Sequence, residues 1–302
     1  MKPPQLFPGG RMPFLIMLTC LLGLSMAASE DTDFDKAIKA FDQNNIGGYI
    51  QPMVDYFGAN MSGGWYHSAA IPQTGLSLSV NIIAMGSLVQ DDQKTFTAVA
   101  PAGYNPSTFQ SATIFGGEGG EATGPGGLSY GASGGIFNTA LFPLATLQLT
   151  VGSIYGTEAI IRGVPLPEIG NAPKVTFVGF GVRHSISQYL PEAPLDLAAG
   201  VFYNHIDVGD LVAMKSFAFG VQASKSFSVL EVYGGLAYEK SSTDISYVST
   251  STGSPNVSVS LDGANTFRAT AGVGLNLAVL HFFVDANVGS ITNLSGGIGF
   301  GF

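Results

Sequence analysis

The chain has 302 residues, and charged residues make up 11% of them. Soluble domains carry roughly 25% charged residues, so this chain could hardly cover a water-exposed surface with charge. Its 41 glycines and its positive mean hydropathy agree with that conclusion. The net charge of −9 disfavours nucleic acid as a partner, because phosphate binding needs a basic surface.

The first 28 residues have the pattern of a signal peptide. Lys2 and Arg11 precede an apolar run at 14–24, and small residues follow at 25–28, which is the order of an export signal and its cleavage site. The single cysteine, Cys20, lies inside the apolar run. We therefore predict an exported chain whose mature part contains no thiol and no disulfide.

Residues 29–73 form a predicted N-terminal segment with helical character. Phe34, Ile38 and Phe41 are spaced four and three apart, and after a break at Gly47 and Gly48 a second short segment repeats the helical spacing. Two placements remain open for these helices. They either cap one end of the domain that follows, at residues 74–302, or plug its interior.

From residue 75 onward the apolar period changes to two. In residues 267–277 the odd positions are apolar, while the even ones, such as Arg268 and Gly272, are polar or small. Residues 280–289 and 294–302 repeat this alternation. Such segments are typical of β-strands with one apolar face.

A soluble sandwich also alternates, but its second face carries charge, whereas here that face is mostly Gly, Ser, Ala, Thr and Asn. The segments match the 9 to 11 residues that a tilted strand needs to cross a bilayer. After residue 28 no stretch approaches the roughly 20 apolar residues of a spanning helix. We therefore predict an all-β fold, a transmembrane antiparallel up-and-down β-barrel, with a secreted soluble β-protein as the competing interpretation.

The strand number follows from parity. Barrels with both chain ends on the periplasmic side have an even number of strands. We predict twelve strands, with ten or fourteen as alternatives, and long loops outside the cell at 116–135 and 241–255. The twelve segments are 75–89, 93–99, 108–115, 144–152, 155–163, 174–188, 195–206, 211–226, 230–245, 264–277, 280–289 and 294–302.

The end of the chain resembles the C-terminal signal of Gram-negative outer-membrane barrels. The last alternating strand carries Phe300 and ends on Phe302, and the resemblance covers residues 75–302 in pattern. It implies location in the cell outer membrane, contact with outer-membrane lipid, and recognition of Phe300 and Phe302 by the barrel-assembly machinery.

Two further runs are similar to an uncharacterised family of outer-membrane barrels with an N-terminal helical segment. These runs are Gly64-Trp65-Tyr66-His67-Ser68-Ala69 and Val182-Arg183-His184 with Tyr189-Leu190-Pro191. That family has no established activity, so the resemblance implies architecture alone. A weaker likeness is to the long-chain fatty-acid transporter family, which places an N-terminal hatch inside its barrel. The Asn-Pro-Ala motif of that family is missing near the mature N-terminus, and Asn105-Pro106 lies far downstream.

The candidate functional residues are those predicted to face the lumen. They are Arg183, Glu231, Tyr233, Glu239, Arg268 and Asp285. Either these side chains pair with one another and fill a narrow interior, or they line a pore and set its selectivity.

We predict no enzyme, no cofactor and no metal site. The four histidines have no paired spacing typical of metal ligands. His184 and Ser185 are adjacent and so point to opposite faces of a strand, and no serine is identified beside His281 and Asp285. The run from Gly116 lacks the Gly-Lys-Ser/Thr of a phosphate-binding loop.

The predicted function is passive, porin-like passage of small or hydrophobic molecules through the barrel. The ligand would then be a small solute or an apolar molecule. The alternative is a non-transporting structural or binding barrel that uses its outer loops. Conductance with and without residues 29–61 would separate the two.

Overall fold

The computed structural model describes residues 36, 38–137, 139–164, 175–190, 192–208, 211–250 and 256–302. The predicted signal peptide lies outside these ranges. No helix in the described ranges is both long enough and apolar enough to cross a membrane.

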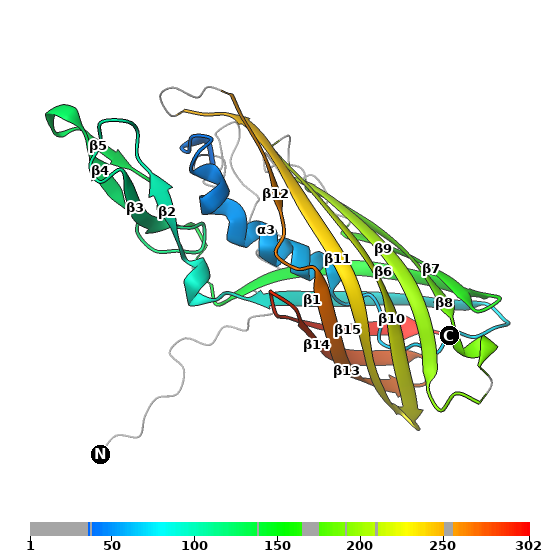
Figure 1. The fold of residues 1–302 in the computed structure, drawn as a ribbon. Helices are drawn as coiled ribbons and strands as arrows, with labels where there is room; N and C mark the ends of the chain where they lie inside the picture. The colour runs from blue at the N-terminus through cyan, green and yellow to red at the C-terminus, as the bar shows by residue number, and fades with distance from the viewer. Residues whose placement is uncertain are drawn as a thin grey trace, which may run out of the picture.

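Ten strands in the described ranges close into one antiparallel barrel (Figure 1). They follow one another around the wall, and β15 pairs back with β1 to complete the ring. The predicted barrel is therefore confirmed, and its ten strands lie at the lower end of the predicted range. The wall consists of β1 (Ser77–Leu88), β6 (Leu141–Ile154), β7 (Thr157–Val164), β8 (Val175–Ser185), β9 (Asp196–Val208), β10 (Val212–Phe227), β11 (Leu230–Val248), β13 (Phe267–Leu277), β14 (Leu280–Val288) and β15 (Asn293–Gly301).

The outer face of this wall is apolar. Outward side chains such as Ile82, Val221 and Leu236 are more than half exposed, and closure leaves no unpaired strand edge. Phe219 and Tyr238 lie next to each other on this face, with ring centroids 5.3 Å apart. A continuous apolar band is the surface that a barrel presents to lipid.

Two of the predicted wall segments belong to a separate hairpin. Residues 93–99 and 108–115 contribute β2 (Thr95–Val99) and β3 (Thr108–Ala112), which pair with each other outside the barrel. Each has five residues, too few to cross a bilayer. Phe109 instead packs into a small core with Ala98 and Ala122.

The remaining described elements extend the same end of the molecule or cover turns. The strands are β4 (Glu121–Thr123) and β5 (Ser129–Gly131), which pair with each other, and β12 (Asn256–Asp262), which pairs with the distal part of β11. The short helices are η1 (Asp91–Gln93), η2 (Pro125–Gly127) and η3 (Ser187–Tyr189). In Figure 1 the β2–β5 extension projects to the left of the barrel.

The two ends of the barrel differ in their connections. At one end the turns at 155–156, 228–229 and 278–279 are two residues long, and both the C-terminus and the start of β1 lie there. We call this the short-turn end. The opposite end, called the long-loop end, carries the β2–β5 extension and the β11–β12 hairpin.

Helix α3 (Ile46–Ser62) lies in the mouth of the barrel at the long-loop end. The helix includes Gly47 and Gly48, where the sequence predicted a break, so that prediction was wrong. Most of its side chains are buried because the surrounding wall is apolar at this level. The wall and hairpin residues packed on it include Ile114, Phe142, Phe177, Ile206, Met214 and Ile245.

After α3 the chain runs through the lumen as a segment without regular structure, residues 63–73, which we call the strap. Near its start, Trp65 stacks on Phe202 of β9 with ring centroids 4.7 Å apart. Near its end, Ile71 packs with Ala198 at the short-turn end. β1 then begins at Ser77. The N-terminal segment thus has its helix in one mouth of the barrel and its strap in the lumen.

Candidate functional site

The C-terminus of α3 is held by a buried arginine from the barrel wall. Arg162 of β7 is 1% exposed, and its Nη1 donates to the Gly63 carbonyl oxygen at 3.0 Å. Its Nη2 donates to the Met61 carbonyl oxygen, and its Nε to Asn204 Oδ1 at 2.9 Å. The guanidinium also lies 3.5 Å from the centroid of the Trp65 ring. A cation at the carbonyl end of a helix is stabilised by the helix dipole.

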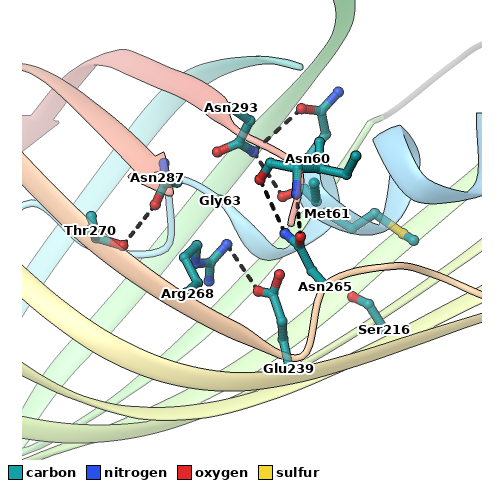
Figure 2. A network of polar contacts seen from close by, with 12 residues as sticks. Asn60, Met61, Gly63, Ser216, Glu239, Asn265, Arg268, Thr270, Asn287 and Asn293 are labelled. Atoms are coloured by element: carbon teal, nitrogen blue, oxygen red, sulfur yellow. Dashed lines mark hydrogen bonds and ion pairs between the residues drawn. The ribbon is translucent and has the colours of Figure 1, made fainter. Parts of the chain in front are cut away.

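Asparagines join the last turn of α3 to three other strands. Asn60 Nδ2 donates to the Phe142 carbonyl oxygen, and its Oδ1 accepts from Ser87 Oγ, both at 2.8 Å. Asn293 Nδ2 donates to the Ala59 carbonyl oxygen at 2.8 Å. Figure 2 shows Asn60 and Asn293 pointing toward each other within this polar network. The helix end is therefore tied to β1, β6 and β15 as well as to β7.

Charged wall residues meet in pairs inside the barrel. Arg268 Nη1 lies 3.3 Å from Glu239 Oε2, and both side chains are almost fully buried (Figure 2). Tyr233 donates its hydroxyl to Asp285 Oδ2 at 2.9 Å. A buried carboxylate or guanidinium is costly without a partner, and these two contacts give Glu239, Arg268 and Asp285 partners inside the barrel.

A second arginine joins the strap to the wall. Arg183 of β8 forms an ion pair with Glu158 of β7, with 2.7 Å between Nη1 and Oε1. Its Nε donates to Gln222 Oε1 at 2.8 Å, and its Nη2 donates to the Ser68 carbonyl oxygen. Ser68 and Arg183 belong to the two runs that carry the family resemblance. Those runs are thus the two sides of one contact.

The strap then meets a buried carboxylate. Ser68 Oγ donates to Glu231 Oε1 at 2.7 Å, and Ser226 donates to the other oxygen of the same carboxylate. The Ala69 amide donates to Ser224 Oγ at 2.9 Å. Glu231 is 1% exposed, so the strap covers it from solvent.

Small wall residues make room for the strap rings. A Cβ on Gly181 would lie 3.2 Å from the Trp65 ring, and one on Gly235 would collide with the Tyr66 hydroxyl. On β15, a Cβ on Gly297 would collide with Phe283, a side chain of the wall itself. The glycines of the inner wall therefore accommodate the strap and neighbouring side chains, and no free space is left at these positions.

All six predicted lumen residues have side chains inside the barrel. Their exposed fractions are 5% for Arg183, 1% for Glu231, 4% for Tyr233, 2% for Glu239, 6% for Arg268 and 3% for Asp285. The structure brings four of them together as two pairs, while Arg183 and Glu231 contact the strap instead. A role in lining a passage stays a prediction.

The predicted assembly residues lie on the outside. Phe300 and Phe302 are 54% and 69% exposed. The Phe302 amide donates to the Leu78 carbonyl oxygen at 3.0 Å, which extends the seam where the last strand meets the first. Their recognition by an assembly machinery stays a prediction.

Sequence reasoning missed Arg162 and Glu158. Both lie at even positions of β7, on the same face as Ile160, which is 1% exposed. Because an isoleucine occupies the inner face, β7 does not show a clean apolar alternation. The signal available in the sequence was that Glu158 and Arg162 both occupy even positions of this strand.

Similar proteins are found at the level of family and fold. No curated protein matches the chain. Among solved structures, the attachment invasion locus protein Ail of Yersinia pestis is 11% identical, with 76% of this chain and 100% of that chain covered and a TM-score of 0.30. The translocator domain of the autotransporter NalP from Neisseria meningitidis is 12% identical over 76% and 89%, with a TM-score of 0.33.

An OmpT loop-deletion mutant, an outer membrane protein of Vibrio cholerae, is 10% identical over 76% of this chain and 98% of that chain, with a TM-score of 0.28. The family match is far more extensive, since it covers residues 11–302. The chain therefore belongs to the family of unknown function DUF6588.

Proposed function

We propose that this protein is an outer-membrane barrel for the passage of small or hydrophobic molecules, in which α3 and the strap act as the gate. One observation carries the proposal. In the described part of the chain, no backbone-to-backbone hydrogen bond joins the strap to a barrel strand, whereas each wall strand is paired on both sides. The strap can therefore move aside within the lumen without any ladder of the barrel being broken.

In the closed state α3 and the strap occupy the lumen, which accounts for the burial of its charged residues. Arg162, Arg183 and Glu231 are buried because α3 and the strap cover them. Passage needs a state in which these contacts are exchanged for water or for the permeating molecule. The gate is then an equilibrium between a seated and a released segment.

A disulfide across the strap contact tests the gate. Ser68 Oγ and Ser224 Oγ lie 3.4 Å apart, so the pair Ser68→Cys and Ser224→Cys would tether the strap to β10. The pair Ser246→Cys and Ser258→Cys is the matched control, because its two Oγ atoms are 3.5 Å apart in the β11–β12 hairpin. The predicted absence of other cysteines from the mature chain makes both tethers specific.

The measurement is solute entry into liposomes and single-channel conductance, each with and without reductant. We expect the strap pair to be silent when oxidised and to regain permeability on reduction, while the control pair is insensitive to reductant. Equal permeability of the strap pair in both redox states would contradict the gate. Silence of the parent protein and of both reduced pairs would contradict passage itself.

The second candidate is a non-transporting barrel that binds a partner at its long-loop end. The observation that favours it is the β2–β5 extension, which has an apolar core of its own around Ala98 and Phe109. Residues 241–248 belong to β11, so the loop to replace by a short turn is 249–255. Binding that survives the oxidised Ser68–Ser224 tether and is lost on this replacement would favour the second candidate.

A further inference from the structure

The N-terminal segment crosses the barrel once before the wall begins. β1 starts at the short-turn end, where Leu78 pairs with Phe302, but the first described residues lie at the long-loop end. There the Thr250 amide donates to the Lys39 carbonyl oxygen at 2.8 Å. Tyr247 donates its hydroxyl to the Phe41 carbonyl oxygen at 3.1 Å. The two ends of the described chain are thus at opposite ends of the barrel.

Residues 41–45 contact the β2–β5 extension, which lies outside the barrel. Asn45 Nδ2 donates to the Val99 carbonyl oxygen at 2.9 Å, and the Val99 amide donates back to Asn45 Oδ1 at 2.8 Å. The Phe41 ring meets the Phe96 ring of β2 edge-on, with centroids 6.4 Å apart. These contacts fasten the beginning of the segment to β2, so its position at this end is specified by several independent interactions.

We propose that the N-terminal part of the mature chain is displayed on the cell surface, and that the lumen of its own barrel is the route by which it gets there. The proposal rests on the outer-membrane location stated above, and not on passage of solutes. Outer-membrane barrels place their long loops outside and their short turns in the periplasm. With that orientation, the strap connects a surface-exposed segment at residues 36–45 to a periplasmic start of β1.

This arrangement makes the long-loop end a composite surface. It contains the segment at 36–45, the β2–β5 extension and the β11–β12 hairpin, which come from three separate parts of the chain. The segment at 36–45 therefore lies beside these hairpins, at the end that this orientation places outside the membrane.

Single cysteines report which side of the membrane each end occupies. Gln43 and Glu118 are exposed at the long-loop end, and Glu192 is exposed in the loop between β8 and β9 at the short-turn end. The variants Gln43→Cys, Glu118→Cys and Glu192→Cys would be treated with a membrane-impermeant maleimide in intact cells and again after the outer membrane is permeabilised.

We expect the Gln43→Cys and Glu118→Cys proteins to be labelled to the same extent in intact cells, and the Glu192→Cys protein to be labelled after permeabilisation alone. Labelling of Gln43→Cys that needs permeabilisation, or that fails in both conditions, would overturn the proposal. Labelling of Glu192→Cys in intact cells would overturn it too, because the barrel would then be inverted. A protein that is impermeable to solutes but labelled at residue 43 would refute the gate and leave the display intact.

Discussion

Replacing Trp65 by alanine should release the strap. The Trp65 side chain is 2% exposed and lies between the Phe202 ring and the Arg162 guanidinium. Loss of a buried tryptophan side chain costs about 3–5 kcal/mol. The released strap makes none of these contacts, so the whole cost falls on the seated state.

The expected magnitude follows from that free energy. Since about 1.36 kcal/mol corresponds to a factor of ten, the released population should rise about 150-fold to about 5,000-fold. Ser224 is 2% exposed beneath the strap and accepts a hydrogen bond from the Ala69 amide. A thiol introduced by Ser224→Cys therefore becomes reactive when the strap moves off β10, and its labelling rate follows the released population if opening is fast.

The assay compares maleimide labelling of Ser224→Cys with and without Trp65→Ala in detergent micelles. Phe219→Ala, which removes a 49% exposed ring from the outer face of the same strand, is the matched control and should leave the labelling rate unchanged. The heat-dependent gel shift of an intact barrel checks that each variant is folded. Labelling rates within about threefold of each other in folded Trp65→Ala and parent proteins would show that this ring does not hold the strap.

Three other changes test the packing of the interior and the seam. Gly235→Val forces a side chain against the Tyr66 hydroxyl and the Val221 carbonyl oxygen and should lower the free energy of urea unfolding by about 1–3 kcal/mol; unchanged unfolding of the Gly235→Val protein would contradict the clash. Glu239→Leu and Arg268→Met should each cost about 3–5 kcal/mol, and the double variant less than their sum; strict additivity would show that the pair is not coupled. Phe302→Ala should reduce the heat-modifiable fraction in outer-membrane preparations, whereas Phe302→Tyr keeps an aromatic end and should not; equal assembly of the two would contradict the predicted signal.

The barrel wall was predictable because lipid imposes a strict period on it. The predicted strand 264–277 begins three residues before β13 and ends with it, 280–289 exceeds β14 by one residue, and 294–302 is shifted from β15 by one residue. Each outward position must be apolar, so the alternation is clearest where the wall is surrounded by lipid alone. The pattern also assigned the correct face to Arg183 and Asp285, since inward and outward residues alternate without exception along these strands.

Short alternating segments were not predictable in the same way. The segments at 93–99 and 108–115 have a strand-like pattern, but the apolar faces of β2 and β3 meet their own small core instead of lipid. Alternation specifies that one face is buried. It does not specify what covers that face, so the count of twelve included two strands that lie outside the wall.

The strap was the part of the interior least accessible to sequence reasoning. Residues 63–73 have no period of their own, because their conformation is determined by the wall that surrounds them. Trp65 fits against Gly181, and the Ser68 carbonyl oxygen accepts from Arg183. These partners are more than 100 residues apart in the chain, so no local pattern could reveal them.

The contact between Asn293 and Ala59 joins residues separated by 234 positions, so the last strand of the barrel helps to hold the first helix. Contacts of such sequence separation form late in folding, because the long intervening chain must be ordered first. The helix cannot be fully seated until β15 has taken its place beside β1. A fully seated helix therefore indicates that the wall is complete. In a chain that stalls before its last strand forms, the helix would not be held in the mouth of the barrel.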